Sequence, residues 1–341
     1  MLLQSFLSNR KQYVSLNGYD SEILELKCGI PQGSTLGPLL FLLYINDLRF
    51  CLKNSKASHF ADDTCITNAN RNCKALERSL NQDLKNVENW LNANRLSLNV
   101  KKTKLLIFHS KRKKIEQNSV SIKLSGNLLT PVENVKYLGM SIDNNLSWDA
   151  HVYNLSKKLG RANGILAKLR HYVPLKNRVS VYYAIFHSQI LYGCTAWSLS
   201  TLKNINSINV LQKKCIRIMN FAPYNSHTNE LFHKNQIIKL NDIIKIEQIK
   251  LAFLFKLNLL PDDLMGLFHN NENIYNTRNM VHGGIKVPKI KTVSYGDRTI
   301  RFNVPTQWNA FIKENDYSTF RNINHLKYYL KKYTLNSYKA L

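Results

Sequence analysis

Acidic residues are scarce in this chain. Its 341 residues include 22 Asp and Glu against 48 Lys and Arg, which leaves a formal net charge of +26. A field of that sign favours polyanionic partners, either nucleic acid or an anionic membrane surface. A merely solvated, soluble surface would explain so large a surplus less well, so the charge predicts a nucleic-acid partner.

Cysteine and long apolar stretches are also scarce. The six cysteines include no CxxC pair, which argues against a zinc module, and they are too dilute for a disulfide scaffold. The longest apolar stretch, Leu36–Ile45, is interrupted by Gly37 and Pro38 and is about half as long as a membrane helix. The amino terminus lacks the apolar run of a signal peptide. We therefore predict an intracellular protein, nuclear or cytoplasmic, with no membrane partner.

Hydrophobic patterning changes near residue 145. Before that point, Asn17-Gly18 is a strong hairpin signal, residues 76–91 have the period of an amphipathic helix, and residues 104–108 are predicted to form a strand. After it, helical periodicity dominates over 152–169, 179–191, 202–219 and 243–260. The predicted fold class is α+β, with three regions: 1–145, a helical region over 146–260, and a C-terminal extension over 261–341.

Two adjacent acids, Asp62 and Asp63, lie between two short apolar runs that are predicted to be strands. Neighbouring carboxylates repel each other unless a cation holds them ionised, and Mg²⁺ is a hard ion that prefers oxygen ligands. Enzymes that transfer phosphoryl groups with two metal ions stabilise the attacking and leaving oxygens in this way. The alternative is that Asp-Asp is only a favourable turn dipeptide.

A glycine-rich segment precedes this pair, with the sequence Gly-Ile-Pro-Gln-Gly-Ser over residues 29–34 and an apolar helix after it. Backbone N–H groups at a helix start can face phosphate. Gly33 has no Cβ and would let a nucleotide approach the backbone, and Gln32 can both donate and accept hydrogen bonds. A loop that only caps a buried helix would explain the glycines but not the whole string.

Four motifs in this order resemble the palm of reverse transcriptases, specifically those of jockey-like retrotransposons without long terminal repeats. Residues 31–34 resemble the second palm motif of that family, and residues 60–63 (Phe-Ala-Asp-Asp) resemble the third. Residues 98–103 (Leu-Asn-Val-Lys-Lys-Thr) resemble the fourth, and residues 137–139 (Tyr-Leu-Gly) resemble the fifth. Weaker similarity to the region after the palm continues through 211–217, 275–278 and 307–309.

The resemblance implies RNA-directed DNA polymerisation from a primer 3′-hydroxyl. It implies an RNA template, a DNA primer or duplex, deoxynucleotides and Mg²⁺ as partners and cofactor. Asp62 and Asp63 would bind the metal, and Lys102 would act at the leaving pyrophosphate. The residues that would position the nucleotide and template are Pro31, Gln32, Gly33 and Phe60. Those that would contact the primer are Tyr137, Leu138 and Gly139.

A run of basic residues follows the amphipathic helix without an intervening acid. We predict that these residues contact the nucleic-acid backbone, in a salt-sensitive and sequence-independent way. The alternative is a solvated hairpin tip or a patch of the kind found in nuclear-localisation signals. The predicted backbone contacts are Lys101, Lys104, Lys111, Arg112, Lys113 and Lys114.

The first palm motif of the family, which carries its other metal-binding aspartate, has no counterpart in the sequence. Asp20 precedes the second motif too closely and in a turn-like context. We therefore expect an incomplete palm, from a 5′-truncated copy or a partial gene model, that is inactive alone. The alternative from another class is a non-enzymatic, basic nucleic-acid-binding remnant. An unrelated Asp-Asp metal phosphohydrolase would not explain the glycine-rich string.

Overall fold

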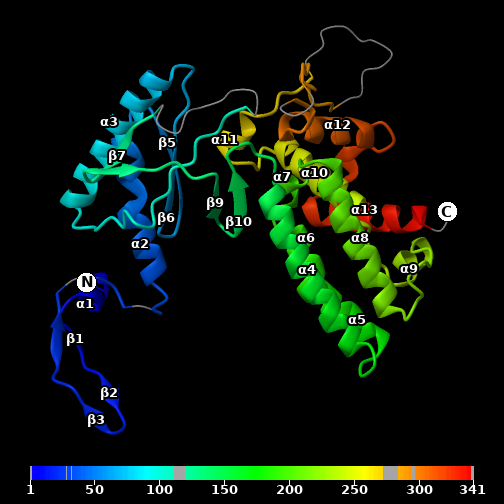
Figure 1. Ribbon diagram of the computed structural model, residues 1–341, viewed down its shortest axis with the longest axis horizontal. Coiled ribbons are helices and arrows are strands. Elements are labelled where there is room, and N and C mark those ends of the chain that lie inside the picture. Colours follow the sequence, from blue (N-terminus) through cyan, green and yellow to red (C-terminus); the bar gives the residue numbers. More distant parts are fainter. Residues whose placement is uncertain are drawn as a thin grey trace. The chain divides into compact units, whose positions relative to one another are not determined.

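The structure is a computed structural model that describes residues 2–27, 29–31, 33–110, 120–271, 283–292 and 296–338. The chain divides into two compact units, the first made of Met1–Leu105 and Lys113–Pro131 and the second of Leu106–Arg112 and Val132–Leu341 (Figure 1). Helices combine with antiparallel strand pairs, which agrees with the predicted α+β class. Within the described ranges, no helix is both long and apolar enough to span a membrane.

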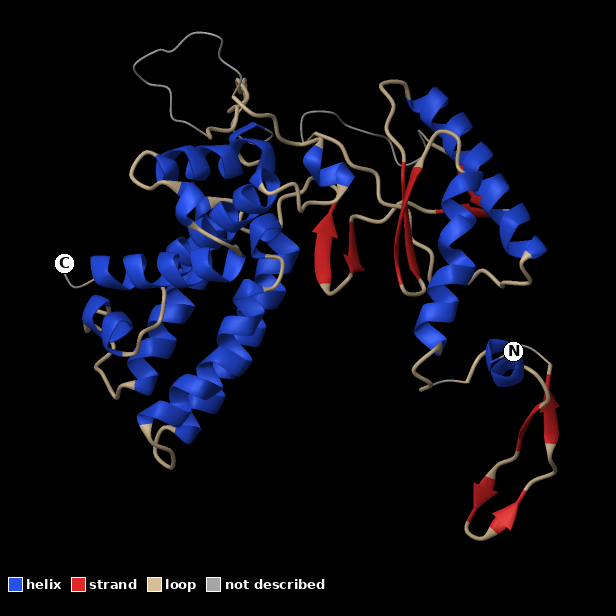
Figure 2. Ribbon diagram, turned by 180° about the vertical axis from the view of Figure 1, so that it is seen from behind, coloured by secondary structure: helices blue, strands red, loops and turns tan. Residues whose placement is uncertain are grey.

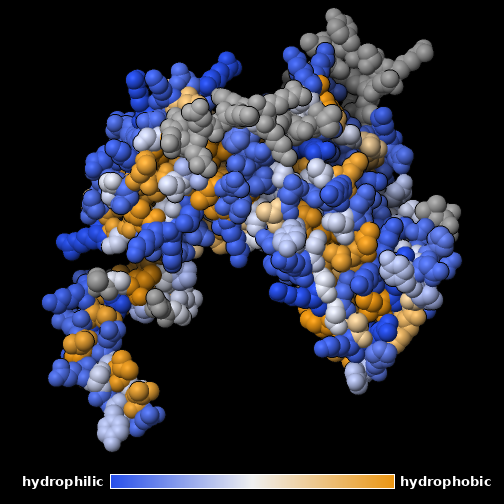
Figure 3. Space-filling model, in the orientation of Figure 1, coloured by the Kyte–Doolittle hydropathy of each residue, from blue (hydrophilic) through white to orange (hydrophobic). Residues whose placement is uncertain are grey.

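The first unit begins with a short helix and a long, narrow hairpin. Asn17 and Gly18 form its turn with φ of 52° and 84°, and a turn with both central residues at positive φ matches the twist of the flanking strands. This confirms the hairpin predicted at Asn17-Gly18. The side chains of Val14 and Tyr19 in this hairpin are exposed. Figure 3 shows hydrophobic residues on the surface of the hairpin. The elements are α1 (Leu2–Leu7), β1 (Arg10–Gln12), β2 (Ser15–Leu16), β3 (Tyr19–Asp20) and β4 (Leu24–Leu26), with β1 paired to β4 and β2 to β3.

The core of the first unit lies between two helices. Ile45 and Leu48 pack against Val87 and Leu91, and the half-buried Ile66 packs against this cluster. The last turns of the amphipathic helix thus hold the strand that follows the Asp-Asp pair. The elements are α2 (Gly37–Ile45), the 3₁₀ turn η1 (Asn46–Cys51), β5 (Lys56–Phe60), β6 (Asp63–Thr67) and α3 (Cys73–Ala93).

A third hairpin, β7 (Ile122–Leu124) and β8 (Asn127–Leu129), lies along α3. Ile122 and Leu124 are buried while Lys123 is exposed, the alternation of a strand with one covered face. The Asn81 side chain joins it to α3, donating to the Ser121 carbonyl at 2.9 Å and accepting from the Lys123 N–H at 2.9 Å.

The prediction of a strand over residues 104–108 is wrong. Leu105 forms only an isolated parallel bridge with Pro131, and the neighbouring residues form no strand. The apolar run has the composition of a strand, but a strand also needs a partner for its N–H and C=O groups. Within the described ranges, no ladder of such bonds extends along this run.

In its described residues, the second unit is mostly helical and begins with the β9–β10 hairpin (Figure 2). The helices predicted over 152–169, 202–219 and 243–260 are confirmed as α4, α8 and α10. The segment predicted as one helix over 179–191 contains a π-helical turn, Tyr183–His187, between α5 and α6. The elements are β9 (Asn134–Tyr137), β10 (Met140–Asp143), α4 (Asp149–Leu169), α5 (Leu175–Tyr182), α6 (Ser188–Leu191), α7 (Cys194–Trp197), α8 (Leu202–Met219), α9 (Asn229–Lys234), α10 (Leu240–Lys256), α11 (Asp262–Met265), α12 (Ile300–Ile312) and α13 (Ile323–Ser337).

Two apolar clusters form the core of this unit. Leu159 and Leu166 of α4 pack with Phe186 and with Ile216 of α8 in the first cluster. Phe253 of α10, Trp308 of α12 and Leu326 of α13 belong to the second cluster. Because α10 contributes to both, it joins the α4–α8 half to the carboxyl-terminal helices.

Amide side chains of α8 and α12 connect these helices to distant segments of the chain. Gln212 donates to the Tyr182 hydroxyl at 2.9 Å and to the Ile238 carbonyl at 3.0 Å, and accepts from the Leu240 N–H at 2.8 Å. Asn309 pairs with both backbone groups of Ile285, at 2.9 and 2.8 Å. Gln212 and Asn309 lie in two of the segments predicted to resemble the region after the palm, and both have structural roles here. The third such segment, 275–278, lies outside the described residues.

Candidate functional site

The Asp-Asp pair lies at the tip of the β5–β6 hairpin. Phe60 pairs with Asp63, which leaves Ala61 and Asp62 as the two turn residues, and Ala61 has a φ of 51°. Both carboxylates are exposed, and Phe60 is 64% exposed beside them. The turn therefore presents two acids and an aromatic ring to solvent.

His59 lies just behind this turn. Its Nδ1 is 3.1 Å from the Thr64 hydroxyl across the hairpin. Burial lowers the pKa of His59, and the nearby Arg49 lowers it further. A neutral ring that holds the two strands together fits a structural role for this histidine.

The two aspartates could supply some of the oxygen ligands of a hard cation. Carboxylate oxygens are suitable ligands, and Mg²⁺ completes its coordination with water and substrate oxygens. In the part of the chain that the structure describes, no third His, Cys, Asp or Glu joins them in a metal-binding group. The hairpin can thus contribute to a metal site but does not complete one.

The glycine-rich segment forms hydrogen bonds within itself before α2 begins. Ser34 donates its hydroxyl hydrogen to the Pro31 carbonyl at 2.8 Å and accepts from the Gly37 N–H at 3.1 Å. Gly33 has a φ of 84°, which a residue with a Cβ adopts only with strain. A Cβ on Gly37 would lie 2.9 Å from the Ser34 oxygen. The hydrogen bonds of Ser34 therefore stabilise the conformation of this loop, a role that was not predicted. Gln32 lies outside the described residues.

Two of the six predicted backbone contacts, Lys101 and Lys104, lie on or beside one helical turn of the first unit, together with Lys102. The N–H of Lys102 donates to the carbonyl of Asn99 at 3.1 Å, and that of Thr103 to the same carbonyl at 3.2 Å. The side chains of Lys101, Lys102 and Lys104 are exposed. The remaining four, at 111–114, lie outside the described residues.

The three residues predicted to contact the primer lie at the β9–β10 turn. Leu138 and Gly139 have φ of 45° and 78°, so both turn residues are left-handed. Tyr192 donates its hydroxyl hydrogen to the Leu138 carbonyl, and a Cβ on Gly139 would lie 3.5 Å from the Tyr192 ring. This hairpin belongs to the second unit, whereas Asp62 belongs to the first. The structure therefore places the third and fifth motifs in different compact units.

Asp83 is a buried acid of the first unit that was not predicted. Its carboxylate accepts from the backbone N–H groups of Lys53 and Asn54, both at 2.9 Å, and so fixes the loop before β5. Burial by itself would raise the pKa of Asp83, but hydrogen bonds from Lys53, Ser55 and Asn54 outweigh it and lower the pKa. The sequence signal that could have predicted this role is an acid among the buried, mostly apolar positions of α3.

Comparison with known proteins agrees with the resemblance to reverse transcriptases. Residues 2–142 match the family described as reverse transcriptase (RNA-dependent DNA polymerase). The chain is 26% identical over 275 residues to the RNA-directed DNA polymerase from mobile element jockey of Drosophila melanogaster, covering 77% of this chain and 29% of that protein. It is 30% identical over 233 residues to the probable RNA-directed DNA polymerase from transposon X-element of the same species, covering 64% of this chain and 24% of that protein. The chain thus spans less than a third of the length of these relatives.

Proposed function

Because residues 2–142 of this chain are related to the reverse transcriptases of retrotransposons without long terminal repeats, we propose that the chain takes part in RNA-directed DNA synthesis. The observation that carries the proposal is the exposed Asp62-Asp63 turn inside the matched region. In this proposal residues 1–145 supply palm motifs, 146–260 a thumb-like helical region, and 261–341 a C-terminal extension.

Asp62 and Asp63 are the proposed metal-binding residues. When bound, Mg²⁺ would stabilise the attacking and leaving oxygens of the phosphoryl transfer. Their exposure at a two-residue turn leaves their oxygens free to reach a cation. Lys102 would place its positive charge near the leaving pyrophosphate.

Residues of the glycine-rich loop and of the Asp-Asp hairpin are proposed to position the nucleotide and template. Gly33 lets a ligand approach the backbone without meeting a Cβ, and Phe60 offers an exposed ring. Pro31 and Gln32 complete this set. The backbone of the nucleic acid is proposed to contact Lys101, Lys104, Lys111, Arg112, Lys113 and Lys114.

The primer is proposed to contact Tyr137, Leu138 and Gly139. Tyr192 holds the Leu138 carbonyl, so the turn keeps its shape when a ligand binds. This turn belongs to the second unit.

A further carboxylate is proposed to be necessary. Two-metal catalysis needs carboxylates around both ions, and the described residues place no third ligand with Asp62 and Asp63. We therefore expect no primer extension by the chain alone.

The test is a primer-extension assay with Mg²⁺ or Mn²⁺ on an RNA template. The chain would be assayed alone and also fused to the region that precedes the matched segment in the jockey polymerase. We expect extension only from the fusion, and none from the fusion carrying Asp62→Asn. Extension by the chain alone would contradict the need for another carboxylate. A folded fusion that binds primer and template but does not extend would contradict the polymerase assignment.

A second candidate is nucleic-acid binding without catalysis. The net charge of +26 favours it, because binding through phosphates needs only positive charge. Binding that persists without a divalent ion, together with an inactive fusion, would support this candidate.

A further inference from the structure

A long stretch of the second unit contains no acidic residue. Residues 150–229 include eleven Lys and Arg and no Asp or Glu. The stretch covers most of α4 and all of α5, α6 and α8. Positive charge along these helices therefore has no carboxylate of the same stretch to neutralise it.

Helices α4 and α8 run in the same direction, so their carboxyl ends meet. At their amino ends Asn204 donates to Asp149 at 2.7 Å, and midway Asn163 donates to the Leu211 carbonyl at 3.1 Å. At their carboxyl ends Arg170 lies over the ring of Phe221. Figure 1 shows α4 and α8 with α5 near this end. We call the region around Phe221 the tip.

Two arginines share one aromatic ring at the tip. The guanidinium carbons of Arg170 and Arg178 lie 4.9 and 5.0 Å from the centre of the Phe221 ring. The His171 ring meets the same phenyl ring edge-on, with 5.3 Å between centroids. Both guanidinium groups are positive and contact the same ring, so they repel each other, and a bound anion would relieve that repulsion.

Two of the three guanidinium nitrogens of Arg178 are buried without an acceptor among the described residues. The residue is only 8% exposed, and its Nε and Nη1 are buried with no hydrogen-bond partner among the described residues. A buried charge is costly unless it is paired. The carboxyl ends of α4 and α8 supply only partial negative charge. The site thus lacks the full negative charge that a phosphate would provide.

Exposed aromatic rings surround these arginines. Tyr172 is 85% exposed, Tyr224 84% and Phe221 50%. Arg217 donates to the Ser226 carbonyl at 2.9 Å and lies over the Tyr224 ring at 6.0 Å, which fixes this loop beside the arginines. Exposed rings interleaved with positive charge are typical of sites where unpaired bases stack and phosphates are held.

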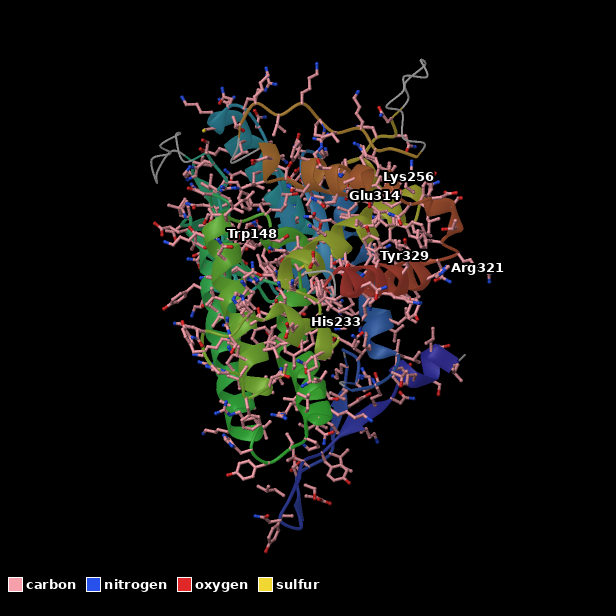
Figure 4. All side chains as sticks on the ribbon, turned by 90° about the vertical axis from the view of Figure 1, so that its right-hand side faces the viewer. Trp148, His233, Lys256, Glu314, Arg321 and Tyr329 are labelled. Atoms are coloured by element: carbon pink, nitrogen blue, oxygen red, sulfur yellow. The ribbon has the colours of Figure 1, made fainter. Side chains whose placement is uncertain are left out.

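We propose that the tip binds single-stranded nucleic acid. The guanidinium groups of Arg170 and Arg217 hold phosphates, the unpaired positive charge of the buried Arg178 attracts them, and the rings of Tyr172, Phe221 and Tyr224 stack against unpaired bases. This site is separate from the β9–β10 hairpin, because the 21-residue helix α4 between them spans about 30 Å. Figure 4 labels Trp148 at the β10 end of that helix. The proposal does not depend on polymerase activity.

The test measures binding of a short, fluorescently labelled single strand to the intact chain by anisotropy, without divalent ions. Tyr172→Ala and Tyr224→Ala change exposed side chains and should each weaken binding about tenfold, as loss of one stacked base does. Arg170→Gln should weaken binding and lower the salt slope by about 0.7, the value for one phosphate of a single strand. The matched controls are Tyr328→Ala on α13 and Lys203→Gln at the other end of α8, which should bind as the unaltered chain does.

Three outcomes would overturn the proposal. The first is unchanged single-strand affinity in tip variants that circular dichroism shows to be folded. The second is that the tip variants lose as much affinity for a duplex of the same length as for the single strand. That result would exclude stacking on unpaired bases. The third is tip-dependent binding of inorganic phosphate alone, or of vesicles containing phosphatidylserine, in place of the strand. None of these outcomes bears on primer extension, so failure here and failure of the proposed polymerase function are distinguishable.

Discussion

Asp62 and Asp63 are exposed, and exposure determines how their charges act. Water screens their repulsion, so the pair costs little stability while it stays accessible to a cation. A buried pair would instead need protonation or a permanent counter-ion. The two carboxylates are therefore suited to reversible binding of a metal ion together with substrate.

The first prediction concerns Asp62→Asn, which keeps the shape of the side chain and removes its charge. Without metal, the melting temperature should stay equal or rise, because repulsion with Asp63 is relieved. Mg²⁺ should raise the melting temperature of the unaltered chain and not that of the variant. Thermal melts with and without Mg²⁺ measure both effects.

Asp47→Asn, at an exposed acid of η1, is the matched control and should keep the Mg²⁺-dependent rise. If Asp62→Asn melts much lower than the unaltered chain without metal, the pair is a structural turn. The metal assignment would then be wrong.

At the scale of elements, Asp83 connects α3 with the loop before β5. Its hydrogen bonds lower its pKa, so the folded state favours the charged form. The stabilisation is fully present above the unfolded pKa of about 3.9 and is lost as the pH falls through the lowered folded pKa. The loop that positions the Asp-Asp hairpin therefore depends on this carboxylate staying ionised.

The second prediction is that Asp83→Asn lowers the free energy of unfolding by about 1–3 kcal/mol at neutral pH, because a buried N–H loses its acceptor. The difference between the two proteins should shrink as the pH falls below about 4. Urea titrations at several pH values measure it, with Asp47→Asn as the control. A difference that stays constant down to pH 2 would contradict the role of charge.

Helices α8 and α12 each carry an amide side chain with a structural role. Gln212 and Asn309 were noted only as parts of segments similar to the region after the palm. Each satisfies buried backbone groups of a distant segment, which an apolar residue of similar size could not do. Such side chains specify how the helices pack.

For the whole molecule, the net charge of +26 is the dominant property. Binding that releases counterions from phosphates weakens as salt rises, in proportion to the number of phosphates contacted. The third prediction is that replacing residues 111–114 with glutamine weakens nucleic-acid binding and flattens its salt slope. Each lost duplex phosphate should reduce the slope by about 0.9.

The control replaces four exposed lysines of the carboxyl-terminal helices: Lys313, Lys327, Lys331 and Lys332. It removes the same charge and should change the slope less. An unchanged slope in the 111–114 variant would exclude that run from the binding surface.

The sequence by itself determined the features that depend on neighbouring residues. The Asn17-Gly18 turn, the hairpin around Asp62 and the amphipathic helix α3 follow from turn chemistry and from hydrophobic period, both of which are local. The order of the motifs and the net charge also need no coordinates. These features were enough to predict the resemblance to reverse transcriptases that residues 2–142 show, and to propose candidate metal ligands.

Only the tertiary structure decided which distant residues meet. It brings Asp83 to Lys53 and Asn54, places Tyr137–Gly139 in a different unit from Asp62, and sets Arg170 and Arg178 on one ring. It also leaves the apolar run at 104–108 without a neighbouring strand. Strand pairing, burial of a charge and shared aromatic contacts depend on chain segments far apart in sequence, and local patterns do not specify which segments pack together.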